Sequence, residues 1–147
     1  MSFNYSVHKL LGTVHHYSWG GTTFLPKLLS IENPNHKPFA EYWLGIHAGG
    51  PSSIEVNQQA VLLTDAIATD PKAALSEQVY NHFGGLPYLF KVLDVKDMLS
   101  IQVHPTKEYA KVAFEREDAA GIALNASNRN YKDINHKPEI MLAMSEF

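Results

Sequence analysis

The chain has 147 residues, of which 45% are hydrophobic and 11% aromatic, so it can bury the core of one domain. The 12 basic and 15 acidic residues give a formal net charge of -3, which argues against nucleic acid or an anionic membrane as a partner. The lack of cysteine excludes disulfides and thiolate metal sites. No secretory signal or long apolar stretch is visible, so we expect a cytoplasmic protein.

The first part of the chain predicts short strands separated by turns. Residues 3–10 alternate loosely and predict a strand, residues 15–21 an aromatic-rich loop, and residues 22–30 a short helix or turn. Residues 41–47 end at a Gly-Gly-Pro turn, and residues 52–56 then resume an extended pattern. We expect these last two segments to pair as strands.

A helical region is predicted over residues 64–83, which carry an apolar stripe on one side. Within it, Asp70 is a favourable N-cap and Pro71 suits a first helical position. Gly84 follows as a stop signal.

The next two segments predict a tight antiparallel strand pair. Residues 89–95 and 98–104 are both β-like, and only a polar Lys-Asp step separates them. Pro105 ends the second segment, and Thr106 can cap a helix over residues 106–116.

The end of the chain predicts a loop and then a strand. Residues 117–137 are polar and rich in asparagine, whereas residues 139–144 are an apolar, strand-like run. Because such a strand needs partners on both sides, we expect an unfinished sheet and therefore a truncated chain.

The first chemical motif is Ser-Ile-Gln-Val-His at residues 100–104. Side chains at i and i+2 of a strand share a face, so Ser100, Gln102 and His104 should point together while Ile101 and Val103 pack on the other side. Such a strand lines a polar interior or a cleft. On spacing alone, however, a Gln-x-His pair is more often a hydrogen-bonded strand pair than a pair of metal ligands.

The second motif places Glu139 directly before an apolar run. A carboxylate there is tolerable if it meets a cation, and a divalent metal shared with Gln102 and His104 would provide one. Imidazole and carboxylate suit zinc, with manganese or cobalt as alternatives, and three ligands leave the open position that catalysis needs. A salt bridge from Glu139 to Lys137 or Lys91 is the simpler alternative.

Five segments in this order resemble type I mannose-6-phosphate isomerases, and the resemblance extends along most of the chain. They are residues 17–21 (YSWGG), 40–52 (AEYWLGIHAGGPS), 86–93 (LPYLFKVL), 99–105 (LSIQVHP) and 135–139 (NHKPE). The resemblance implies a mainly β fold with helical insertions, namely a cupin-like jelly-roll core that this chain leaves incomplete. It also implies one zinc ion per active site.

In that family the metal is held by residues that match Gln102, His104 and Glu139, together with a later histidine that has no counterpart here. A catalytic arginine of the family would also lie beyond Phe147. We therefore expect very low turnover from this chain alone, and the C-terminal half of a parent enzyme as its partner.

The resemblance implies interconversion of mannose 6-phosphate and fructose 6-phosphate, in carbohydrate metabolism, through a cis-enediol. His136 and Lys137 match positions implicated in proton transfer, Lys91 and Ser100 match phosphate-binding positions, and Trp19 would line the sugar site. Trp43 and Phe90 are predicted to belong to the core.

Two alternatives stay open. The chain could be a non-catalytic cupin-like domain that binds a metal or a sugar, or a truncated and inactive fragment.

Overall fold

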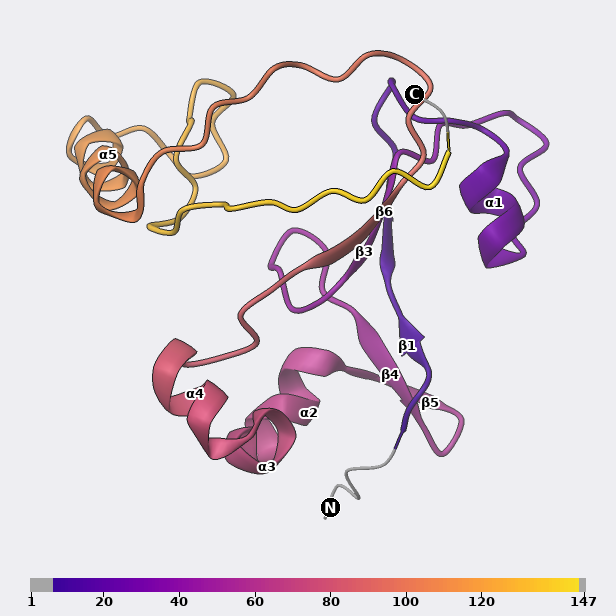
Figure 1. Ribbon diagram of the computed structural model, residues 1–147, viewed down its shortest axis with the longest axis horizontal. Helices are drawn as coiled ribbons and strands as arrows, with labels where there is room; N and C mark the ends of the chain where they lie inside the picture. The colour runs from indigo at the N-terminus through magenta and orange to yellow at the C-terminus, as the bar shows by residue number, and fades with distance from the viewer. Residues whose placement is uncertain (1–6, 146–147) are drawn as a thin grey trace. The chain divides into compact units, whose positions relative to one another are not determined.

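The computed structural model describes residues 7–145 of the chain, shown in Figure 1. The chain divides into two compact units, Met1–Leu99 and Ser100–Phe147. Each unit is described by itself below. Residues 3–6 of the strand predicted over residues 3–10 lie outside the described residues.

The first unit is built on antiparallel strands that form two three-stranded sheets. One sheet has the order β1 (Leu10–Leu11), β4 (Ser53–Val56) and β5 (Gln59–Leu62). The other has the order β2 (Thr13–His15), β3 (Glu41–Leu44) and β6 (Phe90–Leu93). Strand β6 confirms the strand predicted within residues 89–95.

A two-residue turn joins β4 and β5. Asn57 and Gln58 have φ angles of 50° and 64°, and the strands pair directly on either side of them. Two successive positive φ values characterise the type I′ turn, whose twist matches that of a hairpin. This turn fixes the register of the hairpin.

The predicted pairing of residues 41–47 with residues 52–56 is wrong. Strand β3 pairs with β2 and β6, whereas β4 pairs with β1 and β5. The buried Ser52 explains the difference, because its hydroxyl accepts a hydrogen bond from the Gly45 N–H at 2.9 Å and its N–H donates to the Gly45 carbonyl at 2.8 Å. These two hydrogen bonds close the loop between residues 45 and 52, and the chain then enters the β1–β4–β5 sheet.

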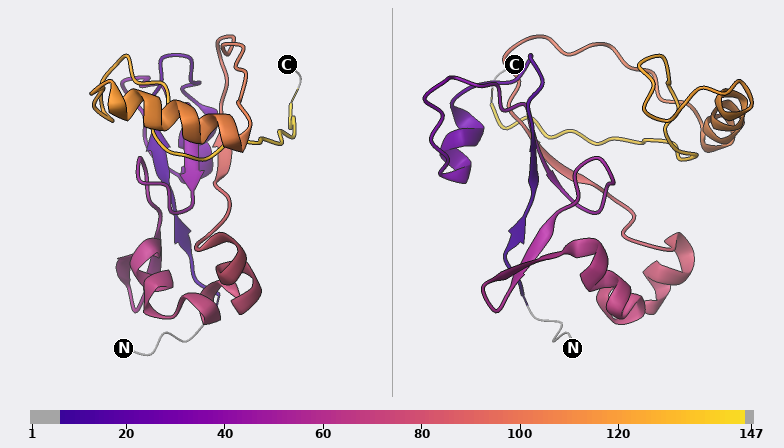
Figure 2. Two further views of the ribbon diagram at one scale, coloured as in Figure 1. Left: turned by 90° about the vertical axis from the view of Figure 1, so that its left-hand side faces the viewer. Right: turned by 180° about the vertical axis from the view of Figure 1, so that it is seen from behind.

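Short helices lie at the two ends of the first unit (Figures 1 and 2). Helix α1 (Phe24–Leu29) follows the prediction for residues 22–30, and it buries Leu25 completely. Helices α2 (Leu63–Thr69), α3 (Pro71–Leu75) and α4 (Glu77–Phe83) lie at the end that carries β4 and β5. Of these helices, α2 and α3 border an apolar hollow of about 660 Å³.

The helical region predicted over residues 64–83 is thus divided into three helices. The divisions occur at Asp70, with φ -152°, and at Ser76, with φ 70°. Proline disfavours helical geometry in the residue before it, so Pro71 explains the first division. The side chain of Asp70 accepts a hydrogen bond from the Ala73 N–H at 3.1 Å, which confirms it as an N-cap, and Gly84 ends α4 with a φ of 73°.

The second unit contains α5 (Lys107–Ala119), the longest of the described helices. Its predicted cap is confirmed, because the Thr106 hydroxyl accepts a hydrogen bond from the Tyr109 N–H at 3.3 Å. Ala110 and Ala113 are buried on one face of the helix. The helix gives this unit its small core.

The strands predicted over residues 98–104 and 139–144 are absent from the described part of the chain. Most of their apolar side chains, which were expected to pack, are exposed, as at Ile101 (98%) and Ile140 (103%). A strand requires a neighbour to complete its hydrogen-bond ladder, and these segments have no strand beside them among residues 7–145. No described helix is long and apolar enough to cross a membrane.

Candidate functional site

The structure brings two of the three predicted metal ligands together within the second unit. His104 lies just before α5 and Glu139 lies well after it, yet their Nε2 and Oε2 atoms are 3.5 Å apart. Two donors that are each about 2.1 Å from a tetrahedral zinc ion lie about 3.4 Å from one another. The imidazole and the carboxylate therefore fit zinc in both donor type and spacing.

The third predicted ligand points to a different neighbour. The Gln102 amide donates a hydrogen bond to the Ser100 hydroxyl at 3.3 Å, as expected for side chains two residues apart in an extended segment. The described contacts of Gln102 do not include His104 or Glu139. Residues 7–145 also contain no cluster of three or more histidine, cysteine or acidic side chains that could hold a metal. The described site thus offers two assembled donors.

The candidate proton-transfer residues are exposed in the loop before Glu139. Lys137 Nζ lies 4.0 Å from Asp133 Oδ2, and Asp133 also accepts a hydrogen bond from the Asn135 N–H. His136 lies near enough to Glu108 to help lower the pKa of that carboxyl, after the larger effects of the Glu108 N–H and the Thr106 hydroxyl. Within the described part of the second unit Lys137 pairs with Asp133 rather than with Glu139.

In the first unit, one face of the β2–β3–β6 sheet carries polar and aromatic side chains. The register sets His15 opposite Glu41 and Trp43 opposite Lys91, so these four residues share a face. Trp43 was predicted to lie in the core. It is instead half-buried on this face, between the rings of His15 and His47 at centroid distances of 3.9 and 4.9 Å.

Lys91, the predicted phosphate ligand, lies on the same face. Its Nζ atom is 3.5 Å from Glu41 Oε2 and 4.9 Å from the centroid of the Trp43 ring. The Trp43 indole N–H donates to the same Glu41 carboxylate, which is buried. The Glu41 carboxylate and the Trp43 ring thus hold the half-buried Lys91 ammonium group in a defined position. Phe90 projects to the opposite face of its strand and is 56% exposed, so the prediction that it belongs to the core is wrong.

Burial perturbs two ionisable groups beside this face. It lowers the pKa of His15, an effect that the nearby Glu41 carboxylate partly opposes, and it raises the pKa of Tyr17. The Nε2 atom of His15 is buried without a hydrogen-bond partner in the described chain. The predicted sugar-site residue Trp19 stacks on Tyr17, which in turn stacks on His15, at 5.7 Å in each case.

Four residues of this face received no site role from the sequence, namely His15, Glu41, Trp43 and His47. The i, i+2 spacing of Glu41 and Trp43 was a usable signal, since both follow the strand period. Placing His15 and Lys91 beside them required the strand register. The register depends on strands that lie far apart in the sequence.

The whole described chain matches a known family. The model for "phosphomannose isomerase type I, catalytic domain" matches residues 7–147. The chain is 47% identical to mannose-6-phosphate isomerase of Salmonella typhimurium and 44% identical to that of Escherichia coli, in each case over 142 residues that cover 96% of this chain and 36% of the relative.

Solved structures agree with this match. A mannose 6-phosphate isomerase from Salmonella typhimurium, bound to fructose 6-phosphate (f6p) and zinc, has a TM-score of 0.79 and 48% identity. A zinc-bound mannose 6-phosphate isomerase has a TM-score of 0.79 and 47% identity. Each match covers 88% of this chain and 33% of the other. The chain therefore spans about a third of the length of the proteins that it matches.

Proposed function

This chain belongs to the type I phosphomannose isomerase family, and we propose that it forms part of a zinc-dependent enzyme that interconverts mannose 6-phosphate and fructose 6-phosphate. The observation that carries the proposal is the 3.5 Å separation of His104 Nε2 and Glu139 Oε2. Zinc accepts both donor types, and the separation is that of neighbouring ligands on one tetrahedral ion.

His104, Glu139 and Gln102 are the proposed zinc ligands in this chain. Gln102, whose amide nitrogen donates to Ser100, would supply its amide oxygen as a third donor. The fourth donor that the family resemblance implies, a later histidine, has no counterpart among residues 1–147. Bound zinc supplies Lewis-acid stabilisation of the negative charge that develops on substrate oxygens during isomerisation.

The other proposed roles belong to side chains that would hold the sugar phosphate and move a proton. Lys91 and Ser100 would bind the phosphate, the lysine as a point charge and the serine as a hydroxyl donor. Trp19 would line the sugar. His136 and Lys137, which are exposed beside Glu139, would carry the proton between C1 and C2.

A zinc titration of the full 147-residue chain tests the metal assignment. Isothermal titration calorimetry should detect one zinc site, which His104→Ala and Glu139→Gln should each remove. The matched control is His36→Asn, because His36 is an exposed loop histidine with a φ of 49° that asparagine tolerates. Zinc binding that survives the His104 and Glu139 substitutions would contradict the assignment.

A coupled assay with mannose 6-phosphate tests how far this chain acts alone. Because the described residues hold two assembled donors, we expect very low turnover. The same observation favours the alternative of a metal- or sugar-binding domain without activity. Robust turnover would exclude that alternative and would contradict the expectation of an incomplete site.

A further inference from the structure

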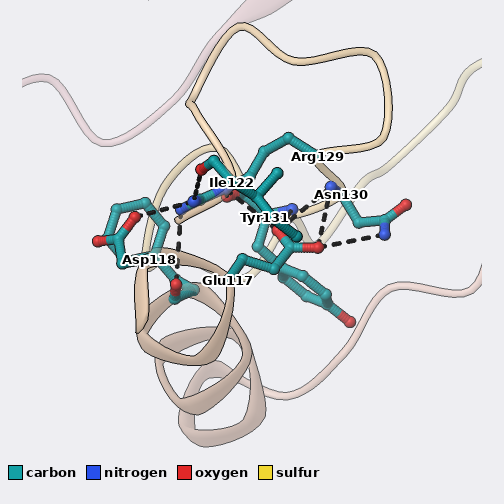
Figure 3. Close-up of polar contacts among 7 residues, drawn as sticks. Glu117, Asp118, Ile122, Arg129, Asn130 and Tyr131 are labelled. Atoms are coloured by element: carbon teal, nitrogen blue, oxygen red, sulfur yellow. Dashed lines mark hydrogen bonds and ion pairs between the residues drawn. The ribbon is translucent and has the colours of Figure 1, made fainter. Parts of the chain in front are cut away.

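A buried arginine organises the end of the α5 unit (Figure 3). The Arg129 side chain is completely buried, and its Nε lies 3.1 Å from Glu117 Oε2 while its Nη1 donates to Asp118 Oδ1 at 2.8 Å. The Ile122 carbonyl also accepts from Nη1, at 2.7 Å. Burial of a charge is costly unless it is paired and hydrogen-bonded. This arginine meets both conditions.

The Glu117–Arg129 pair holds both main-chain polar groups of Tyr131. The Tyr131 N–H donates to Glu117 Oε2 at 2.8 Å, and the Tyr131 carbonyl accepts from Arg129 Nε at 2.5 Å. The Asn130 N–H and side-chain amide donate to Glu117 as well, both at 3.2 Å. These hydrogen bonds lower the pKa of the Glu117 carboxyl, with the bond from Tyr131 as the largest cause. Glu117 is therefore held as a carboxylate.

The side chain of Tyr131 extends from this pair towards the N-terminal end of α5. Its ring lies 6.3 Å from the ring of Tyr109, in the first turn of the helix. Both tyrosines, with His104 and Thr106, line a hollow of about 510 Å³. The proposed zinc ligand thus shares this hollow with a tyrosine that is anchored at the far end of the helix.

In the sequence, the two proposed ligands flank the anchored structure, one before it and one after it. His104 lies two residues before the Thr106 cap, and Glu139 lies eight residues after Tyr131. When Tyr131 is fixed, only Pro105 on one side and residues 132–138 on the other separate the anchored structure from the two ligands. Shorter flexible segments lose less entropy when their ends are brought together.

We propose that Glu117 and Arg129 are positioning residues, which anchor Tyr131 so that His104 and Glu139 are kept at ligand separation. The role in zinc binding rests on the proposed function, whereas the anchoring of His104 does not. Glu117→Gln keeps the shape of the side chain but removes its charge. It should weaken zinc binding by less than the roughly 10- to 100-fold that is typical of a residue bonded directly to a metal ligand, because Glu117 acts through Tyr131.

The test compares Glu117→Gln with Glu115→Gln in the full chain. Glu115 lies on the same helix and its side chain is exposed, so its substitution should leave zinc affinity unchanged. The histidine-ring NMR signals of the zinc-free protein give a readout that does not depend on metal. Glu117→Gln should shift or broaden the His104 ring signals and leave those of His15, in the other unit, unchanged.

If Glu117→Gln fails to fold, Tyr131→Ala tests the positioning role instead. It removes the Tyr131 ring but keeps the main-chain hydrogen bonds to Glu117 and Arg129. A folded Tyr131→Ala variant should also perturb the His104 ring signals, whereas Tyr131→Phe should restore them. Wild-type His104 signals in a folded Glu117→Gln or Tyr131→Ala variant would overturn the positioning role. Failure of the wild-type chain to bind zinc, with the His104 signals still responding, would instead contradict the proposed function alone.

Discussion

Lys91 and Glu41 lie diagonally across the pairing of β3 and β6, with the ammonium nitrogen 3.5 Å from a carboxylate oxygen. Trp43 contacts both, because its ring lies under the ammonium group and its indole N–H donates to the carboxylate. Glu41 is therefore already an anionic partner of Lys91. A bound phosphate would have to share the lysine with this carboxylate or displace it.

Lys91→Met should weaken binding of fructose 6-phosphate by at least roughly tenfold, because a hydrogen bond to a charged group contributes about 1.5–3 kcal/mol. Calorimetric titration with fructose 6-phosphate and with fructose would measure the effect, which should be confined to the phosphorylated sugar. Lys72→Met is the matched control, since Lys72 is an exposed lysine paired with Glu77 on another part of the same unit. Equal affinities in both variants would remove Lys91 from the phosphate site.

His15 should make the stability of the first unit depend on pH. Burial lowers its pKa below 6.5, so the unfolded chain binds the proton more tightly than the folded chain. The contribution of neutral His15 is therefore complete above about pH 6.5 and is lost as the pH falls through the lowered pKa. Urea unfolding at pH 7.5 and 5.0 should show a smaller difference for His15→Asn than for the wild-type chain. His36→Asn should retain the wild-type difference.

Ser52→Ala should destabilise the first unit by about 1–3 kcal/mol, the cost of leaving a buried donor without its partner. The Gly45 N–H would lose the Ser52 hydroxyl, and the side chain of Ser52 is completely buried. Urea unfolding monitored by tryptophan fluorescence would report the loss. Ser18→Ala, at an exposed turn position of the same unit, should change stability by no more than about 0.5 kcal/mol.

Thr106→Ala should destabilise α5 by about 1 kcal/mol through loss of its N-cap. The Tyr109 N–H would exchange its hydrogen faster, because it donates to the Thr106 hydroxyl. Amide hydrogen exchange measured by NMR would locate the effect in the first turn. Thr106→Ser keeps the hydroxyl and should exchange at close to the wild-type rate, so equal rates for both variants would argue against the cap.

The sequence predicted well those features that depend on a few neighbouring residues. Asp70 and Thr106 act as caps through a bond to a residue three positions ahead, and Pro71 acts on the residue directly before it. The same information failed at residues 98–104, where the β pattern is present but a strand would need a partner from elsewhere. Pairing is a property of two segments, and a local pattern describes one.

In the candidate site, too, the features that depend on distant segments could not be predicted from local sequence. Spacing alone left Gln102, His104 and Glu139 as one possibility among several, and the family resemblance selected them. The approach of His104 to Glu139 depends on how residues 105–138 fold between them, which no short motif encodes. The contacts of His15 with Trp43 were equally hidden, because they require the register of β2 against β3.

The exposed apolar side chains at residues 101 and 103, and again at residues 140–144, also affect how the chain behaves at high concentration. Ile140, Leu142 and their neighbours form an uncharged run whose main chain is available to a second molecule, which is the pattern of an aggregation-prone edge. Pro138 bounds this run and Pro105 bounds the other, and proline cannot donate a hydrogen bond to a growing ladder. Each of these prolines therefore ends its apolar stretch on one side.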